Sequence, residues 1–199
     1  MSLPFFDALS ERRSVYAIGN KEIAAIDKVM EVIELSLKHT PTAFNSQSGR
    51  LVLLKGANHA KAWDMTEAAL RGMIPADQFE PTETKIRSFR AGLATVLFYE
   101  DTTIVKGLQE QFPAYSENFT IWSSQANGML QLALWTGLRQ LGYGASLQHY
   151  GEVIENDFRA AFGIDPAWKL VAQMPFGNIL EEAGSKEYMP LESRLKVIG

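Results

Sequence analysis

Residues Asn118 to Leu138 read NFTIWSSQANGMLQLALWTGL and contain no Asp, Glu, Lys or Arg. The stretch is helical in character, but a helix on a protein surface normally carries a charged stripe. A membrane span would also lack charge, yet a lipid-facing helix would not hold so many polar groups: Thr120, Ser123, Ser124, Gln125, Asn127, Gln131 and Thr136. We therefore predict a central helix, buried nearly all round, that packs on its own sheet on one side and on a second subunit on the other. Small residues would allow close approach there, namely Ala126, Gly128 and Ala133.

Helices and strands surround this segment in mixed order. Apolar spacing, caps and stop signals predict helices from Pro4 to about Arg12, from Asn20 to Lys38, and over residues 57–71, 83–91, 103–111 and 152–162. Short apolar runs predict strands at 51–54, 95–99 and 169–174, the first fully buried and the last ending at Pro175-Phe176-Gly177. Because the elements do not alternate regularly, we expect an α+β sheet rather than a doubly wound one.

Composition limits the possible functions. With 199 residues, 46% of them apolar, the chain can form one substantial core, so we expect a single domain over residues 1–199. A net charge of −4 provides no basic field, which makes nucleic acid and anionic membranes unexpected partners. The chain has no cysteine and three histidines without ligand spacing, so we expect no disulfide, thiolate nucleophile or metal site. Its first residues show no basic region followed by a long apolar stretch, which predicts no secretory signal and a cytoplasmic location.

Three polar segments carry most of the functional information. Arg12-Arg13-Ser14 suits a phosphate dianion, because guanidinium groups make charge-assisted bonds to its oxygens. The amides in residues 42–47 can face a ligand that both donates and accepts, and the glycines in residues 142–149 let backbone N–H groups approach a flat ring. A flavin mononucleotide (FMN) would use all three segments. The alternatives are solvated arginines at a helix end and ordinary turn residues.

Four stretches together resemble the FMN-dependent nitroreductase family: ERRSVY (11–16), HTPTAFNSQSGRLVLL (39–54), NGMLQLALWTGLRQLGYGASLQHY (127–150) and QMPFG (173–177). The resemblance covers nearly the whole chain and is greatest to the short subgroup of yeast fatty-acid-repression (Frm2-like) proteins and bacterial stress-induced relatives. It implies a mainly antiparallel sheet flanked by helices and a homodimer with FMN at the subunit interface. It also implies a C-terminal extension, residues 185–199, that reaches over the partner subunit. The implied activity is ping-pong hydride transfer through flavin N5, from NADH or NADPH to nitroaromatic or quinone acceptors.

The resemblance also assigns cofactor-binding residues. It places the FMN phosphate at Arg12, Arg13 and Ser14, and the ribityl chain and pyrimidine edge at Asn45, Ser46 and Gln47. The backbone of Gly144, Ala145, Ser146 and Leu147 would lie beside the ring, where N–H groups stabilise charge that develops on reduction. Two positions depart from the common pattern: Ser48 replaces a frequent proline, and the arginine that often precedes Pro190-Leu191-Glu192 is missing. Arg194 and Lys196 would supply that phosphate contact instead.

Large aromatic residues could form the acceptor pocket. Phe44, Trp122, Phe112 and Tyr115, with the loop around Phe79, are the candidates, although large aromatics more often belong to a core. No catalytic side chain is assigned, because the cofactor supplies the hydride chemistry. His149 is a weak candidate for a general acid.

Two other functions stay open at this point. A flavin-binding regulatory protein in stress or lipid signalling would bind FMN with little turnover. A structural dimerisation module would bind no cofactor, and the three polar segments would then be a coincidence.

Overall fold

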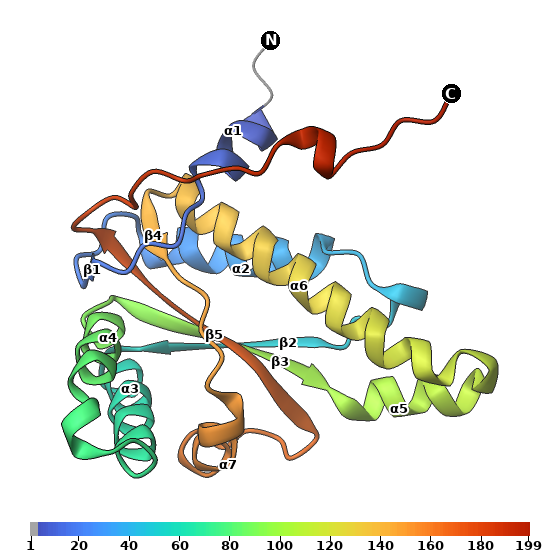
Figure 1. The fold of residues 1–199 in the computed structure, drawn as a ribbon. Coiled ribbons are helices and arrows are strands. Elements are labelled where there is room, and N and C mark those ends of the chain that lie inside the picture. The colour runs from blue at the N-terminus through green and yellow to red at the C-terminus, as the bar shows by residue number, and fades with distance from the viewer. Residues whose placement is uncertain (1–3) are drawn as a thin grey trace.

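A computed structural model of the chain describes residues 4–199, and Figure 1 shows a central sheet with helices on both faces. Met1 to Leu3, part of the stretch examined for a secretory signal, lie outside the described residues. The strands are β1 (Ile18–Gly19), β2 (Gly49–Lys55), β3 (Ala94–Asp101), β4 (Tyr143–Ala145) and β5 (Trp168–Ile179). The helices are α1 (Pro4–Glu11), α2 (Ile26–His39), α3 (Gly56–Arg71), α4 (Glu80–Arg90), α5 (Thr102–Gln111), α6 (Ser116–Gln140) and α7 (Gly151–Phe162). Short 3₁₀ turns are η1 (Ala43–Asn45), η2 (Ala76–Gln78), η3 (Pro113–Tyr115) and η4 (Leu191–Ser193).

The sheet is antiparallel, with strand order β1-β5-β3-β2, and β4 also pairs with β5. β3 lies between β2 and β5, and every one of its residues is buried. In the register of the sheet, Val96 faces Leu53 on β2 and Met174 on β5. This arrangement confirms the prediction of an α+β fold with a mainly antiparallel sheet.

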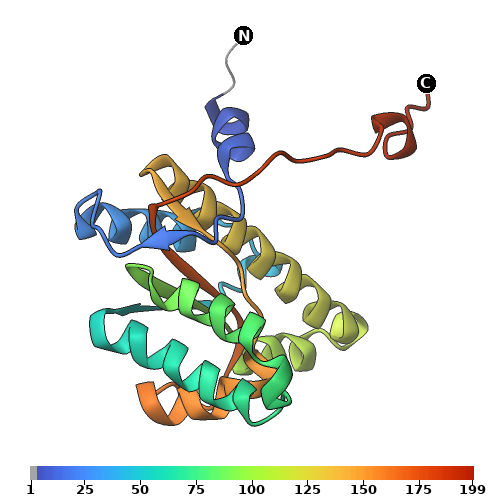
Figure 2. The same ribbon diagram turned by 60° about the vertical axis from the view of Figure 1, so that its left-hand side comes forward.

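Alternate residues of β3 face the two helical layers, as the twofold period of a strand requires. Val96 and Phe98 lie in one core with residues of α2 and α6. Leu97 and Tyr99 lie in the opposite core, with residues of α3 and α7. Figures 1 and 2 show α2 and α6 on one face of the sheet and α3, α4 and α7 on the other.

The uncharged segment forms most of α6, as predicted. Its inner face places Leu130, Leu134 and Leu138 in the core against the sheet. Its outer face is exposed within the chain, where Ile121 is 54% and Met129 is 44% accessible. The contact with its own sheet is therefore confirmed. Burial of the outer face against a second subunit stays a prediction, since residues 4–199 of one chain leave this face exposed. No helix among residues 4–199 is long and apolar enough to cross a membrane.

Two predicted element boundaries and the predicted burial of one strand are corrected by the structure. Helix α2 begins at Ile26 rather than Asn20, because the Tyr143 hydroxyl contacts the backbone of Ile23 and Ala24 and holds that stretch outside the helix. β2 is mostly half-buried rather than fully buried, since it is the edge strand. β5 continues past Pro175 to Ile179, because pairing with β1 and β4 replaces pairing with β3.

The C-terminal segment leaves the body after β5. All residues from 184 to 199 are exposed. In both ribbon views this segment passes near α1 and then runs outward, with η4 away from the sheet (Figures 1 and 2). The prediction that this extension reaches over a partner subunit stays a prediction, because the structure is that of a single chain.

Candidate functional site

The first and third polar segments lie side by side. Ser14 and Ala145 form a parallel bridge, and the Val15 N–H donates to the Ala145 carbonyl at 2.9 Å. The contact requires a glycine at Gly144, because a Cβ there would lie 2.9 Å from side-chain carbons of both Val15 and Ile179. Two predicted cofactor-binding segments, far apart in sequence, therefore form one surface.

The arginine pair offers unsatisfied donors on this surface. The guanidinium carbon of Arg12 lies 4.3 Å from the ring centroid of Trp135, and its buried Nε has no partner among residues 4–199. Burial and then the adjacent charge of Arg13 lower the pKa of Arg12 from its ordinary value. Arg13 donates to the Gly184 carbonyl at 2.9 Å. A bound anion would satisfy the donor and relieve the repulsion, so the pair fits a phosphate.

The turn after β4 presents one free backbone donor. The Ser146 N–H donates to the Pro175 carbonyl at 3.3 Å, and the Gln148 N–H donates to the Gln173 carbonyl at 2.8 Å. Between them, the Leu147 N–H makes no hydrogen bond within the described part of the chain. The turn is thus fixed on both sides and leaves one N–H for a ligand.

The second polar segment lies at the opposite end of α6. The Phe44 ring in η1 is 5.2 Å from the Phe119 ring and stacks on Trp122 at 6.1 Å, measured between centroids. Trp135, which contacts Arg12, lies more than three helical turns further along, roughly 20 Å at 1.5 Å per residue. One chain therefore does not bring Asn45, Ser46 and Gln47 to the other two segments.

The amide side chains of this second segment also lack hydrogen-bond partners among the described residues. Those of Asn45 and Gln47 make no hydrogen bond to any residue between 4 and 199, while the Ser46 hydroxyl lies 3.4 Å from that of Ser48. Ser48, which replaces the frequent proline, is buried and its carbonyl accepts from the Asp101 N–H at 2.9 Å. The loop therefore presents free amides from a backbone that is attached to β3.

The predicted acceptor-pocket residues do come together. Phe44 lies 5.0 Å from Phe112 and 6.3 Å from Tyr115, and Tyr115 lies 5.9 Å from Trp122. Phe119, which the sequence reasoning missed, joins the same cluster and is buried. The inclusion of Phe79 was wrong. Phe79 is buried on the far side of the sheet in a separate core that contains Trp63, Ile86 and Phe89.

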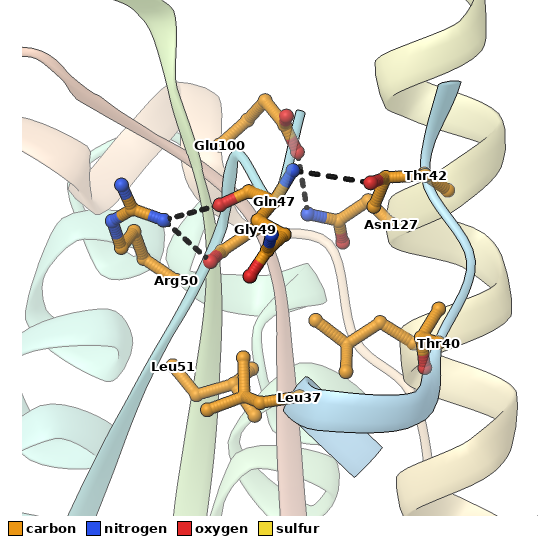
Figure 3. A pocket seen from close by; sticks show the side chains of 11 residues that line it. Leu37, Thr40, Thr42, Gln47, Gly49, Arg50, Leu51, Glu100 and Asn127 are labelled. Atoms are coloured by element: carbon orange, nitrogen blue, oxygen red, sulfur yellow. Dashed lines mark hydrogen bonds between the residues drawn. The ribbon is translucent and has the colours of Figure 1, made fainter. Parts of the chain in front are cut away.

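Two cavities lie against the sheet, and the first of them borders the second segment. One, of about 300 Å³, is lined by Thr42, Gln47 and Arg50 together with Glu100 and Asn127 (Figure 3). The other, of about 520 Å³, contains His149 on its wall and also reaches Glu100.

Glu100 lines both cavities. It is 8% exposed, its Oε2 accepts from Asn127 at 3.0 Å, and its Oε1 has no partner among the described residues. Burial raises its pKa, although hydrogen bonds from Ser48 and Asn127 oppose the shift. Sequence reasoning missed Arg50, Glu100 and Asn127. The only available signal was the pair Asn127 and Gln131, four residues apart in an uncharged helix, which hydrogen-bond at 2.8 Å.

The remaining predicted residues are not gathered at this surface. Arg194 and Lys196 are exposed in the outward C-terminal segment and have no ion-pair partner within the described part of the chain. His149 is exposed. Residues 4–199 contain no cluster of three His, Cys, Asp or Glu side chains that could hold a metal.

Comparisons with known proteins identify the family of the chain. The model of the nitroreductase family matches residues 9–178. The nitroreductase FRM2 of Saccharomyces cerevisiae is 31% identical over 175 residues, which cover 87% of this chain and 86% of FRM2. The structure of nitroreductase CinD from Lactococcus lactis in complex with chloramphenicol is 38% identical, with a TM-score of 0.91, and covers 98% of this chain and 100% of CinD. CinD in complex with 4-nitrophenol gives a TM-score of 0.90 over the same shares of the two chains, also at 38% identity. The match over most of its length, together with the shared fold, shows that the chain belongs to the nitroreductase family.

Proposed function

We propose that the protein is an FMN-dependent oxidoreductase that uses NADH or NADPH to reduce nitroaromatic or quinone acceptors in a ping-pong cycle. The observation that carries this proposal is the Ser14–Ala145 bridge, which sets the arginine pair beside the free Leu147 N–H. Family membership supports a flavin oxidoreductase. The compounds bound to CinD, chloramphenicol and 4-nitrophenol, are both nitroaromatic and support the acceptor class.

Each end of this surface fits a different part of FMN. Arg12, Arg13 and Ser14 would hold the phosphate, because two adjacent cations and a hydroxyl match its oxygens. The backbone of residues 144–147 would flank the flat ring, with the Leu147 N–H as donor. A bound FMN would supply the hydride chemistry between a reduced nicotinamide and the acceptor. No side chain is assigned to acid-base catalysis, and His149 keeps only a surface position on the neighbouring cavity.

We further propose that the working unit is a homodimer of single-domain chains, residues 1–199. A second copy would bring the Asn45, Ser46 and Gln47 loop to the arginine surface that its own chain cannot reach. The exposed, uncharged outer face of α6 would bury apolar side chains in that dimer. The outward C-terminal segment would place Arg194 and Lys196 on the partner as the second phosphate contact.

The aromatic cluster would form the acceptor pocket. Phe44 is half exposed, at 52%, and carries the free ring face of the cluster, while Phe112, Tyr115 and Trp122 support it. A flat aromatic acceptor would stack on Phe44, since stacked and edge-to-face arrangements are favoured between such rings. No charged side chain belongs to the cluster, which favours neutral acceptors.

An absorption spectrum of the purified protein tests the proposal. We expect flavin bands that bleach on anaerobic addition of NADH or NADPH and return on addition of a nitroaromatic or a quinone. Flavin bands that neither nucleotide bleaches would refute the oxidoreductase and favour a flavin-binding regulatory protein. A protein that stays colourless after incubation with FMN would refute the cofactor site and leave a dimerisation module.

A further inference from the structure

The loop between α2 and β2 has an unusual backbone. Phe44, Asn45 and Gln47 have φ values of 55°, 52° and 48°, which lie in the left-handed region that normally favours glycine. Asn tolerates this conformation, whereas Phe and Gln seldom adopt it. Such a backbone persists only where the surrounding structure holds it in place. The contacts that hold Gln47 therefore decide the shape of the proposed flavin-binding loop.

Gln47 is held at both of its backbone polar groups. Its N–H donates to the Thr42 hydroxyl at 3.1 Å, and its carbonyl accepts from Nη1 of Arg50 at 2.7 Å. The same Nη1 also donates to the Gly49 carbonyl at 3.0 Å. Figure 3 shows the Arg50 guanidinium beside Gln47 and Gly49, with both of these bonds drawn. These hydrogen bonds restrain both peptide planes that flank Gln47 and so stabilise its left-handed backbone.

Arg50 connects the loop to the sheet. Its Nη2 donates to Oδ2 of Asp101 at 3.0 Å, while Oδ1 of Asp101 accepts from the backbone N–H and the hydroxyl of Thr103. Burial disfavours the ionised carboxylate, but the Thr103 hydrogen bonds and the Arg50 charge outweigh it and lower the pKa of Asp101. The guanidinium is therefore fixed by a carboxylate that itself caps α5. A lysine could not replace Arg50, because a guanidinium holds several N–H donors in one fixed plane, whereas an ammonium is a compact charge on a flexible stem.

We propose that Arg50 is a positioning residue of the cofactor site, which holds the left-handed backbone at Gln47 so that the free Gln47 and Asn45 amides face the flavin. This proposal rests on the proposed function, since it assigns a role toward the same FMN. Arg50 makes no cofactor contact in this assignment and acts through Gln47. Its role is preorganisation. Without the Arg50 hydrogen bonds, the free-energy cost of ordering the left-handed loop would fall on the binding step, and FMN affinity would be lower.

The test measures FMN affinity of the full-length, flavin-free protein by quenching of flavin fluorescence. Arg50→Ala should raise the Kd about tenfold to a hundredfold, as expected for the loss of charged hydrogen bonds. The Kd of Arg50→Lys should lie between those of the wild type and Arg50→Ala, because one ammonium cannot reach Gln47, Gly49 and Asp101 together. The matched control is Arg90→Ala, which removes a surface ion pair with Asp64 and should leave the Kd unchanged.

Chemical rescue separates positioning from a general effect on stability. Free guanidinium at millimolar concentration, far below denaturing levels, should restore part of the FMN affinity of Arg50→Ala and should not alter that of Arg90→Ala. A purely structural role would lower the melting temperature of the flavin-free protein without changing the Kd of the folded fraction, and guanidinium would then have no effect. That result would overturn the proposal.

A second variant covers the case in which Arg50→Ala does not fold. Thr42→Val removes the other group that holds Gln47, at the N–H, and should also raise the Kd for FMN. A wild-type Kd in Thr42→Val or in Arg50→Ala would overturn the positioning role. Failure of the proposed function has a different signature, because the wild-type protein would then bind no FMN at all.

Discussion

Gly128 offers a sharp test of whether the outer face of α6 contacts a second subunit. A Cβ added at Gly128 would meet no other atom within 4 Å among residues 4–199, and the same is true at Gly107, an exposed position of helix α5. In an exposed helix interior, alanine is about 1 kcal/mol more favourable than glycine. In a single chain, both Gly→Ala variants should therefore be stabilised by about 1 kcal/mol.

If the outer face of α6 lies in a dimer interface, the expected stabilisation changes at Gly128 but not at Gly107. Gly107→Ala should keep its gain, whereas Gly128→Ala should lose it because the methyl groups of both copies enter a close helix contact. Gly128→Glu should weaken association far more, since an unpaired charge buried in an interface costs several kcal/mol. At about 1.4 kcal/mol per tenfold change, the dimer Kd should rise by at least a factor of about 100.

Sedimentation equilibrium over a wide range of protein concentration measures the dimer Kd, and urea unfolding at one fixed concentration measures stability. Gly107→Glu is the control, because it adds the same charge at an exposed helix position outside the proposed interface. The reasoning is refuted if Gly128→Glu dimerises as the wild type does, or if Gly128→Ala is stabilised as much as Gly107→Ala.

Three further predictions concern stability. Burial lowers the pKa of His59, so only the unfolded chain gains a proton as the pH falls through about 6.5. The free energy of unfolding should therefore drop by up to about 1.4 kcal/mol per pH unit in urea titrations from pH 7 to 5, and His59→Gln should remove this slope. Burial raises the pKa of Glu100, so the native state keeps the Glu100 proton to higher pH than the unfolded chain does, and stability falls as the pH rises from 4.5 to that raised value. Glu100→Gln should therefore be more stable than the wild type at pH 8 in the same assay, and a less stable variant would contradict this. A Cβ at Gly177 would overlap a backbone oxygen of β1, so Gly177→Ala should lose about 3 kcal/mol in thermal unfolding, whereas Gly184→Ala, with open space around it, should melt as the wild type does.

Local sequence predicted the long elements better than the short ones. The uncharged stretch from Asn118 to Leu138 lies within α6 because a long periodic segment specifies its own helix. β1 and β4 were not predicted, since strands of two and three residues exist only through their pairing with β5. The start of α2 was misplaced for a similar reason: the Tyr143 hydroxyl, distant in sequence, fixes the preceding backbone.

In the candidate site too, local sequence indicated the residue types, whereas tertiary contacts decide where the residues lie. The residue types of Arg12 and Ser14 indicated a phosphate, but their position beside Ala145 follows from a bridge between distant segments. Arg50 could not be identified, because its role depends on a loop conformation that no local motif announces. Phe79 was wrongly assigned because a single aromatic in a polar stretch does not show which side of the chain faces the core.

The central claim is that each flavin site combines the arginine surface of one chain with the amide loop of another, and a mixed dimer tests it most directly. One chain would carry Arg12→Ala and Arg13→Ala, the other Asn45→Ala and Gln47→Ala, with different affinity tags so that only mixed dimers are purified. A site shared between chains leaves one intact site and one doubly defective site, so we predict one tightly bound FMN per mixed dimer, read from flavin absorbance. A site within one chain leaves both sites defective, and a mixed dimer that binds no FMN while the wild type binds two would contradict the account.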